Sequence, residues 1–214
     1  MPNNCLSIRF LFFLIGLFLV SLGNSLSIIS LAGNGLWTAA SIQISQLGDF
    51  SIKAVLIFIG IAAIILNTIL TKFNWIKILG ELVFVFFFGN LINFFIDKFQ
   101  IITQFTNTYP ARITLAIIGI IIVCIGTSFY QRANLWMYPT DHLTAIVYHR
   151  FFPKNIKKAQ LVVFMIPIAI ILITALPLKS MQGIQVGTVF SLLMNGKIIQ
   201  LSNNYLFPVL KDNR

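Results

Sequence analysis

The chain has 214 residues, of which 58% are hydrophobic and only 9% charged, and its formal net charge at pH 7 is +10. A soluble domain of this length could not bury so much apolar side chain, so the composition excludes an ordinary soluble protein. The apolar residues form blocks of about twenty, the length of a helix that spans a bilayer, and they lack the alternation of barrel strands. The sequence therefore predicts an all-α, polytopic membrane protein.

Six apolar blocks follow one another along the chain, and each predicts one crossing of the membrane. They cover residues 8–29, 53–71, 76–96, 112–131, 158–178 and 183–201. The first block resembles a secretory signal, but its glycine pattern recurs in mid-chain, where no signal can act. We therefore expect it to remain as the first of about six transmembrane helices in a single membrane domain, residues 1–214.

Two further segments, residues 33–48 and 134–150, lie between crossings and are too short to span. The first carries an apolar stripe at helical spacing, formed by Leu36, Ala40, Ile44 and Leu47. We expect each segment to form a short helix that lies in the interface or re-enters the membrane. If both crossed instead, each half would have four spans and the halves would run parallel.

Glycines recur at corresponding positions in the two halves of the chain. The pairs are Gly16 with Gly119, Gly23 with Gly126, Gly80 with Gly187, and Gly89 with Gly196. This recurrence predicts two repeats, residues 8–97 and 112–202. Because three crossings per half is an odd number, the second repeat should be inverted, a common plan of secondary transporters. The glycines are expected to let neighbouring helices pack closely.

Basic residues are distributed unequally between the predicted loops. With the N-terminus in the cytoplasm, ten fall on the cytoplasmic side (Arg9, Lys72, Lys77, Arg132, Arg150, Lys154, Lys157, Lys158, Lys211 and Arg214). Four fall outside, namely Lys53, Lys98, Arg112 and Lys179. This bias predicts that both termini are cytoplasmic. The basic charge is expected to meet anionic lipid headgroups at the cytoplasmic face, with no nucleic acid as a partner.

The segments Ala32-Gly33-Asn34-Gly35-Leu36-Trp37-Thr38 and Leu135-Trp136-Met137-Tyr138-Pro139-Thr140-Asp141 follow the first helix of each half. With the glycine-spaced helices, they resemble the loop Leu-Gly-x-x-Pro-Trp-Asp of the YczE/YitT-like bacterial membrane proteins. The first loop matches at Gly33 and Trp37, and the second at Pro139 and Asp141. The resemblance extends over about residues 9–202. It implies an integral protein of the bacterial plasma membrane and supplies no substrate.

Five residues are candidates for binding a small solute: Trp37, Glu81, Trp136, Asp141 and Lys197. Asp141 is either a cap at the start of the second short helix or a proton- or cation-responsive carboxylate. Glu81 and Lys197 lie inside predicted spans, where a charge costs about 2.5–3.5 kcal/mol. They either reach the interface or form a buried pair with each other. The tryptophans either anchor the protein in the interface or stack against a ligand.

The sequence contains no nucleotide, hydrolase or metalloprotease motif, and we expect neither enzymatic activity nor a cofactor. His142 and His149 lack a third ligand for a metal and are expected to be solvated. Cys5 and Cys124 are expected to be free thiols. The predicted function is a small-solute transporter that rocks one repeat against the other. The alternative is a non-transporting membrane scaffold or regulatory partner. The sequence leaves the solute and the oligomeric state open.

Overall fold

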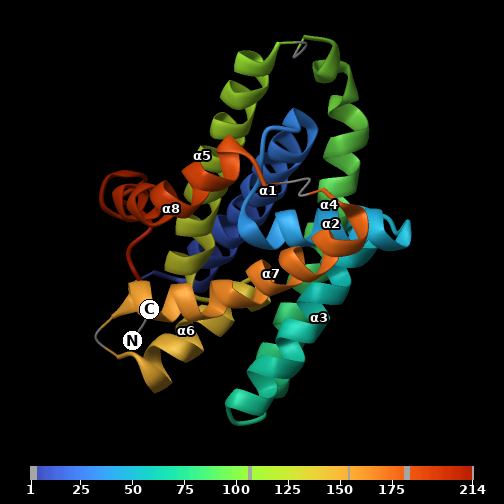
Figure 1. The fold of residues 1–214 in the computed structure, drawn as a ribbon. Helices are drawn as coiled ribbons and strands as arrows, with labels where there is room; N and C mark the ends of the chain where they lie inside the picture. The colour runs from blue at the N-terminus through green and yellow to red at the C-terminus, as the bar shows by residue number, and fades with distance from the viewer. Residues whose placement is uncertain (1–3, 106–107, 154, 181–183, 214) are drawn as a thin grey trace.

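The computed structural model describes residues 4–105, 108–153, 155–180 and 184–213, and in these ranges the chain is helical without β-strands (Figure 1). The helices, in chain order, are α1 (Leu6–Ser30), α2 (Leu36–Gly48), α3 (Ile52–Leu70), α4 (Trp75–Phe99), the 3-10 helix η1 (Gln100–Phe105), α5 (Tyr109–Ala133), α6 (Pro139–Phe151), α7 (Ile156–Leu178) and α8 (Val186–Tyr205). The predicted all-α class is confirmed. Lys154 and Arg214 of the predicted basic set lie outside the described residues.

Five helical segments are long and apolar enough to cross a membrane. They are Leu6–Ser30, Ile52–Leu70, Trp75–Ile102, Tyr109–Ala133 and Lys158–Leu178. Large apolar side chains on these helices face outward, among them Phe58 and Ile173. Because such side chains are solvated by lipid rather than by water, the chain is a multi-pass membrane protein.

The sixth predicted crossing, residues 183–201, starts at a residue outside the described ranges and corresponds to α8, which is not among these five segments. The reason lies in how α8 distributes its side chains. Thr188 and Ser191 are buried against the rest of the protein, whereas Val189 and Leu193 are exposed. Asn195, Lys197 and Gln200 lower the mean hydropathy of α8, and Lys197 and Gln200 interrupt the apolar residues of its outer face.

Helices α1 and α5 form the most extensive helix pair in the structure and run antiparallel. A Cβ atom on Gly16 would lie 2.8 Å from the Gly126 carbonyl oxygen, and one on Gly23 would lie 2.4 Å from the Gly119 carbonyl oxygen. Building the Cβ atoms on Gly126 and Gly119 gives the reciprocal clashes, at 2.8 and 2.6 Å. The two backbones thus touch directly, and no side chain fits between them at these positions.

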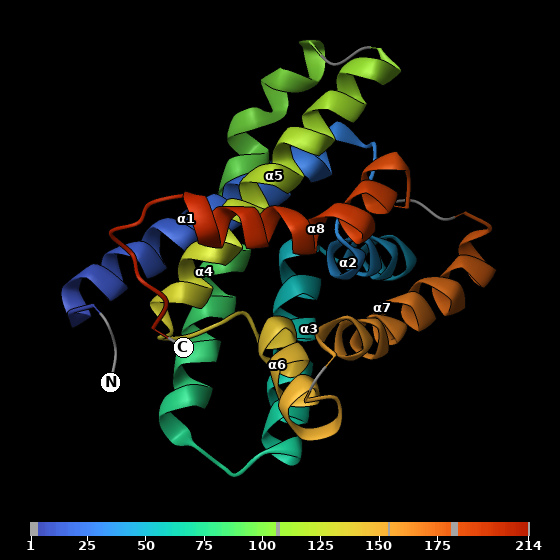
Figure 2. The same cartoon turned by 90° about the vertical axis from the view of Figure 1, so that its left-hand side faces the viewer.

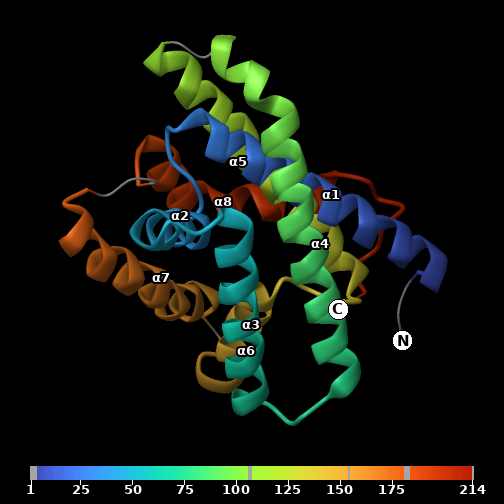
Figure 3. The same cartoon turned by 90° about the vertical axis from the view of Figure 1, so that its right-hand side faces the viewer.

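The remaining helices form pairs around this centre. Helix α4 packs against α1, and α8 packs against α5 (Figure 2). Helix α3 packs against α6 and lies beside α4, to which a short turn joins it (Figure 3). Helix α7 packs against α2 and α6, and α2 also contacts α3. The arrangement brings α6, from the second half of the chain, against α3 from the first half.

Several elements of the two halves have equal lengths and spacing. Helices α1 and α5 each have 25 residues, α2 and α6 each have 13, and in both cases the second starts 103 positions after the first. The residues that follow α1 and α5, Leu31 and Asn134, are both in the left-handed conformation, with φ of 53° and 49°. The chain thus turns in the same way into each short helix.

The two ends of the described chain are hydrogen-bonded to each other. The Asn4 backbone N–H donates to Asn213 Oδ1 (2.8 Å), and the Lys211 N–H donates to Asn4 Oδ1 (2.8 Å). The Arg132 guanidinium, at the end of α5, donates to the Leu210 carbonyl oxygen (2.9 Å). Both ends are therefore fixed at the same end of α5.

Candidate functional site

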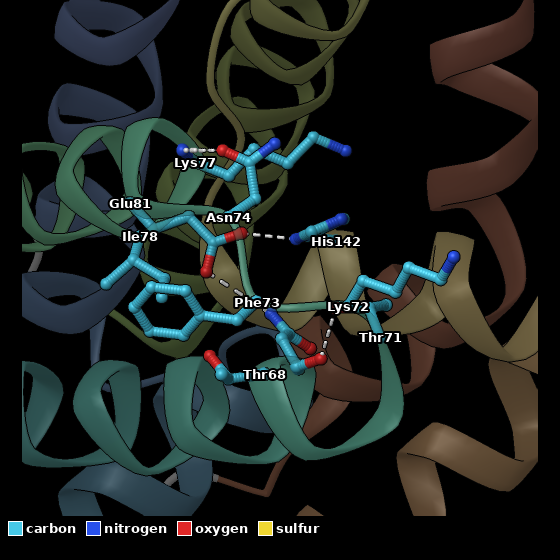
Figure 4. A pocket seen from close by; sticks show the side chains of 10 residues that line it. Thr68, Thr71, Lys72, Phe73, Asn74, Lys77, Ile78, Glu81 and His142 are labelled. Atoms are coloured by element: carbon cyan, nitrogen blue, oxygen red, sulfur yellow. Dashed lines mark hydrogen bonds and ion pairs between the residues drawn. The ribbon is translucent and has the colours of Figure 1, made fainter.

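A buried polar cluster lies where α3, α4 and α6 meet. The Glu81 side chain on α4 is only 5% exposed, and its Oε1 is hydrogen-bonded to His142 Nδ1 of α6 (Figure 4). The Asn67 amide on α3 donates to Glu81 Oε2 (3.3 Å) and to the Pro139 carbonyl oxygen (2.9 Å). Asn67 thus connects the carboxylate to the first residue of α6. When His142 is protonated, its contact with Glu81 becomes an ion pair.

Local sequence explains why these side chains meet. Asn74 caps α4, because its Oδ1 accepts from the N–H groups of Ile76 (3.1 Å) and Lys77 (3.2 Å). The short connection before it folds α4 back along α3, so that Asn67 near the end of α3 faces Glu81 in the second turn of α4. Pro139 suits the first turn of α6, where its missing N–H has no intrahelical partner to lose.

An open pocket with a volume of about 280 Å³ lies over this cluster. Asn67, Glu81 and His142 line its inner part, and the exposed residues Lys72 and Lys77 line its outer part. Figure 4 shows the two lysine side chains extending toward the side of the pocket that His142 occupies. Asn67 Oδ1 is buried and accepts no hydrogen bond from the described residues. The pocket therefore combines a buried carboxylate and amide with two exposed ammonium groups.

Asp141 is next to His142 in the first turn of α6 and belongs to a neighbouring contact. Its Oδ2 accepts a hydrogen bond from the Tyr130 hydroxyl of α5. Burial raises the pKa of the Asp141 carboxyl to about 6, and the hydrogen bond from Tyr130 opposes part of that rise. Burial and the negative charge of Asp141 both raise the pKa of Tyr138, which precedes α6. The Asp141 carboxyl therefore holds its proton to a higher pH than a solvated aspartate does.

Of the five predicted site residues, only Glu81 lines this pocket. The Trp136 ring packs edge-on against Phe13 (5.5 Å between centroids) and covers Gly80, where a Cβ would lie 1.9 Å from the ring. Trp37 packs on the apolar cluster between α6 and α7. Lys197 is exposed on α8.

The hypothesis of a buried Glu81–Lys197 pair is wrong, because the partner of Glu81 is His142. The expectation that His142 is solvated also fails, since its side chain is 19% exposed and contacts Glu81. Nothing in the local spacing of His142 indicates a carboxylate 61 positions earlier in the chain. His149, in contrast, is exposed.

The other predicted packing glycines differ in their surroundings. A Cβ on Gly187 would lie 2.7 Å from the Gly33 carbonyl oxygen, and one on Gly89 would lie 3.1 Å from the Ile57 side chain. Gly196 has no atom within 4 Å of its Cβ position, so the predicted packing role does not hold for it. Cys5 and Cys124 are free thiols, as expected. No group of three or more His, Cys, Asp or Glu residues that could hold a metal ion occurs in the described ranges.

Comparison with known proteins identifies relatives over nearly the whole chain. A family of unknown function, DUF6198, matches residues 7–204. The uncharacterized protein YyaS of Bacillus subtilis (strain 168) is 25% identical over 193 residues, which cover 90% of this chain and 91% of that protein. No solved structure matches. The resemblance to the YczE/YitT-like proteins is not confirmed by these matches.

Proposed function

The chain belongs to the DUF6198 family, and we propose that it is a small-solute permease that binds its solute in the pocket over Glu81. One observation carries this proposal: a carboxylate only 5% exposed, on a candidate membrane-spanning helix, lies at the inner part of an open cavity. A charge at the centre of a span costs about 2.5–3.5 kcal/mol, and ionisable residues within spans usually mark a solute or ion pathway.

We further propose that the chain consists of two inverted repeats. The equal lengths and common offset of α1 with α5 and of α2 with α6 support this, as do the two left-handed turns at Leu31 and Asn134. When each residue is replaced by its counterpart in the other half, the contact of Gly16 with Gly126 becomes the contact of Gly119 with Gly23. The same exchange relates α1–α4 packing to α5–α8 packing, and α3–α6 packing to α7–α2 packing. A two-fold relation between antiparallel helices accounts for all of these pairs.

The joined chain ends support six crossings. Because Asn4 and Asn213 are hydrogen-bonded, they lie on one side of the membrane, and the number of crossings must be even. Five helical segments are long and apolar enough to cross a membrane. In this proposal α8, which exposes Val186, Val189, Leu192 and Leu193, is the sixth crossing. The short helices α2 and α6 then do not span. Labelling of Cys5 and of a cysteine placed at Asp212 from opposite sides of the membrane would contradict this topology.

We propose that the protein lies in the plasma membrane of a bacterial cell with both ends in the cytoplasm, an orientation that the positive-inside bias supports. The α3–α4 turn, which carries Lys72, then lies on the same side, and the pocket opens to the cytoplasm. Anionic lipid headgroups would surround the basic residues of this face.

In this proposal, the polar cluster is a contact between the two repeats. Asn67 and Glu81 belong to the first half, whereas Pro139 and His142 belong to the second. Rocking of one half against the other would break these bonds and open the site toward the opposite face, as alternating access requires. A solute that provides replacement hydrogen bonds for Glu81 lowers the free-energy cost of that separation.

Solute flux into proteoliposomes tests the permease. Vesicles that contain the purified chain are shrunk osmotically with glycerol, acetate, ethylamine or L-alanine, and reswelling is followed by light scattering. We expect at least one solute to enter faster than into empty vesicles, and Glu81→Gln to reduce that rate at least about tenfold. Lys197→Gln, which removes an exposed charge outside the pocket, should leave the rate unchanged.

A membrane scaffold is the second candidate, and the α1–α5 contact favours it. The backbones meet at Gly23 and Gly119 without space for a side chain, so the centre of the proposed two-fold relation is closely packed. Entry of every solute at the rate of empty vesicles, with correctly folded protein, would refute the permease and favour the scaffold.

A further inference from the structure

The pocket over Glu81 has charges of opposite sign at its two ends. The carboxylate of Glu81 is buried in the inner part, and the ammonium groups of Lys72 and Lys77 are exposed in the outer part. A solute that carries only a positive charge is repelled by the lysines, and one that carries only a negative charge is repelled by Glu81. A solute with both charges satisfies both ends of the pocket.

Besides the Asn67 amide and His142, which already contact Glu81, the pocket is lined by groups that can accept hydrogen bonds. The Thr68 hydroxyl donates to the Ile64 carbonyl oxygen (2.8 Å), and the Thr71 hydroxyl donates to the Asn67 carbonyl oxygen (2.7 Å). Because each hydroxyl proton is engaged within the chain, these two pocket-lining hydroxyls can only accept a hydrogen bond from a solute. Asn67 Oδ1 is a further acceptor, buried and without a partner among the described residues. Together with the carboxylate, these atoms match a group with several N–H donors.

Resting on the permease function proposed above, we infer that the solute is a small zwitterion that carries a primary ammonium group and a carboxylate. Its ammonium group binds among Glu81, Asn67, Thr68 and Thr71, and its carboxylate binds Lys72 and Lys77. The volume of about 280 Å³ lies just below the usual range for ligand pockets, which starts at about 300 Å³, so the solute is of amino-acid size. An ammonium with three donors uses the acceptors that the chain itself leaves available.

Matched probes separate the three charge classes. The full chain in lipid nanodiscs is titrated by calorimetry with the zwitterions glycine, L-alanine and β-alanine, with ethylamine, and with propionate. We expect at least one zwitterion to bind about tenfold more tightly than either singly charged probe. Equal or tighter binding of ethylamine or propionate, or no binding by any probe, would overturn the inference.

Substitution of the lysines gives a result that a folding defect cannot imitate. In a Lys72→Gln/Lys77→Gln variant, the affinity for the zwitterion should fall about tenfold, whereas the affinity for ethylamine should rise, because the repulsion is removed. Both side chains are exposed, so the fold should tolerate the change. Lys197→Gln serves as the control and should alter neither affinity. Parallel loss of both affinities in the lysine variant would count against the assignment.

The flux assay distinguishes this inference from the permease proposal. Preferred binding of a zwitterion without flux would leave the solute class standing and remove the permease. Flux of ethylamine or acetate, with exclusion of L-alanine, would leave the permease standing and remove the solute class.

Discussion

Replacing glycine by alanine should have opposite effects on stability at two positions, because one lies in the backbone contact between α1 and α5 and the other does not. In Gly23→Ala, the new methyl group would lie 2.4 Å from the Gly119 carbonyl oxygen and 2.8 Å from the Val123 backbone nitrogen. Ordinary contact begins at 3.4 Å, so the helices must separate by up to about 1 Å. The obstructing atoms belong to a helix backbone and cannot rotate away. Overpacking of this kind costs about 1–3 kcal/mol, and we expect a value at the upper end.

Gly196→Ala is the matched control. It adds the same methyl group at an exposed position in the middle of α8, where no atom lies within 4 Å of the new Cβ. Replacing glycine by alanine within a helix gains about 0.5–1 kcal/mol, so this variant should be slightly more stable than the parent chain.

Thermal unfolding of the two variants in identical nanodiscs provides the measurement. For a chain of this size, 1 kcal/mol corresponds to roughly 2–4 °C in Tm. Gly23→Ala should therefore lower Tm by about 5–10 °C, and Gly196→Ala should raise it by about 1–4 °C. Equal shifts in the two variants would show that α1 and α5 do not meet at their backbones.

Three further predictions concern the polar contacts. The pKa of Asp141 in the folded state, about 6, exceeds its ordinary value of 3.8, so the folded state binds the proton more tightly than the unfolded state does. The free energy of unfolding should therefore fall by up to about 3 kcal/mol as the pH rises from 3.8 to about 6. Asp141→Asn should remove this pH dependence, and an unchanged profile of Tm between pH 4 and pH 7 would refute the assignment. Tyr130→Phe removes the hydrogen bond that lowers this pKa, so the stability transition should move to higher pH; movement to lower pH would contradict the contact. Asn213→Ala loses the hydrogen bonds of its amide to the Arg132 and Lys211 carbonyl oxygens, which contribute about 1 kcal/mol each. Trypsin should therefore cleave this variant at Lys211 at least about fivefold faster than the parent chain. The control variant Asn204→Ala should be cleaved at the same rate as the parent chain.

The sequence predicts the class and most helices of this fold because helix length and apolar composition are local properties. The proposed crossing at α8 stands out less, since Asn195, Lys197 and Gln200 reduce the mean hydropathy of the segment. Glu81 could be identified as a candidate because a charge inside an apolar block is conspicuous in the sequence itself. Its partner could not, because the contact with His142 depends on how α6 packs against α3 and α4.

The tryptophans illustrate the same limit. Trp136 looks suitable for stacking a ligand, but the missing side chain of Gly80 leaves a space that its ring fills. Which glycine accommodates a helix and which accommodates a ring depends on tertiary packing. The exposed position of Gly196, despite a spacing like that of Gly89, shows that periodicity alone does not identify the neighbour.

The reciprocal contact of α1 and α5 also has a consequence for how the chain can evolve. Gly23 and Gly119 face each other, as do Gly16 and Gly126. The two residues of each pair therefore compete for the same space between the helices. If a larger residue occurs at one of these positions, the facing position on the other helix must remain glycine, and one of the two helices must bend locally. Among related chains, residue size at these positions should therefore covary in pairs.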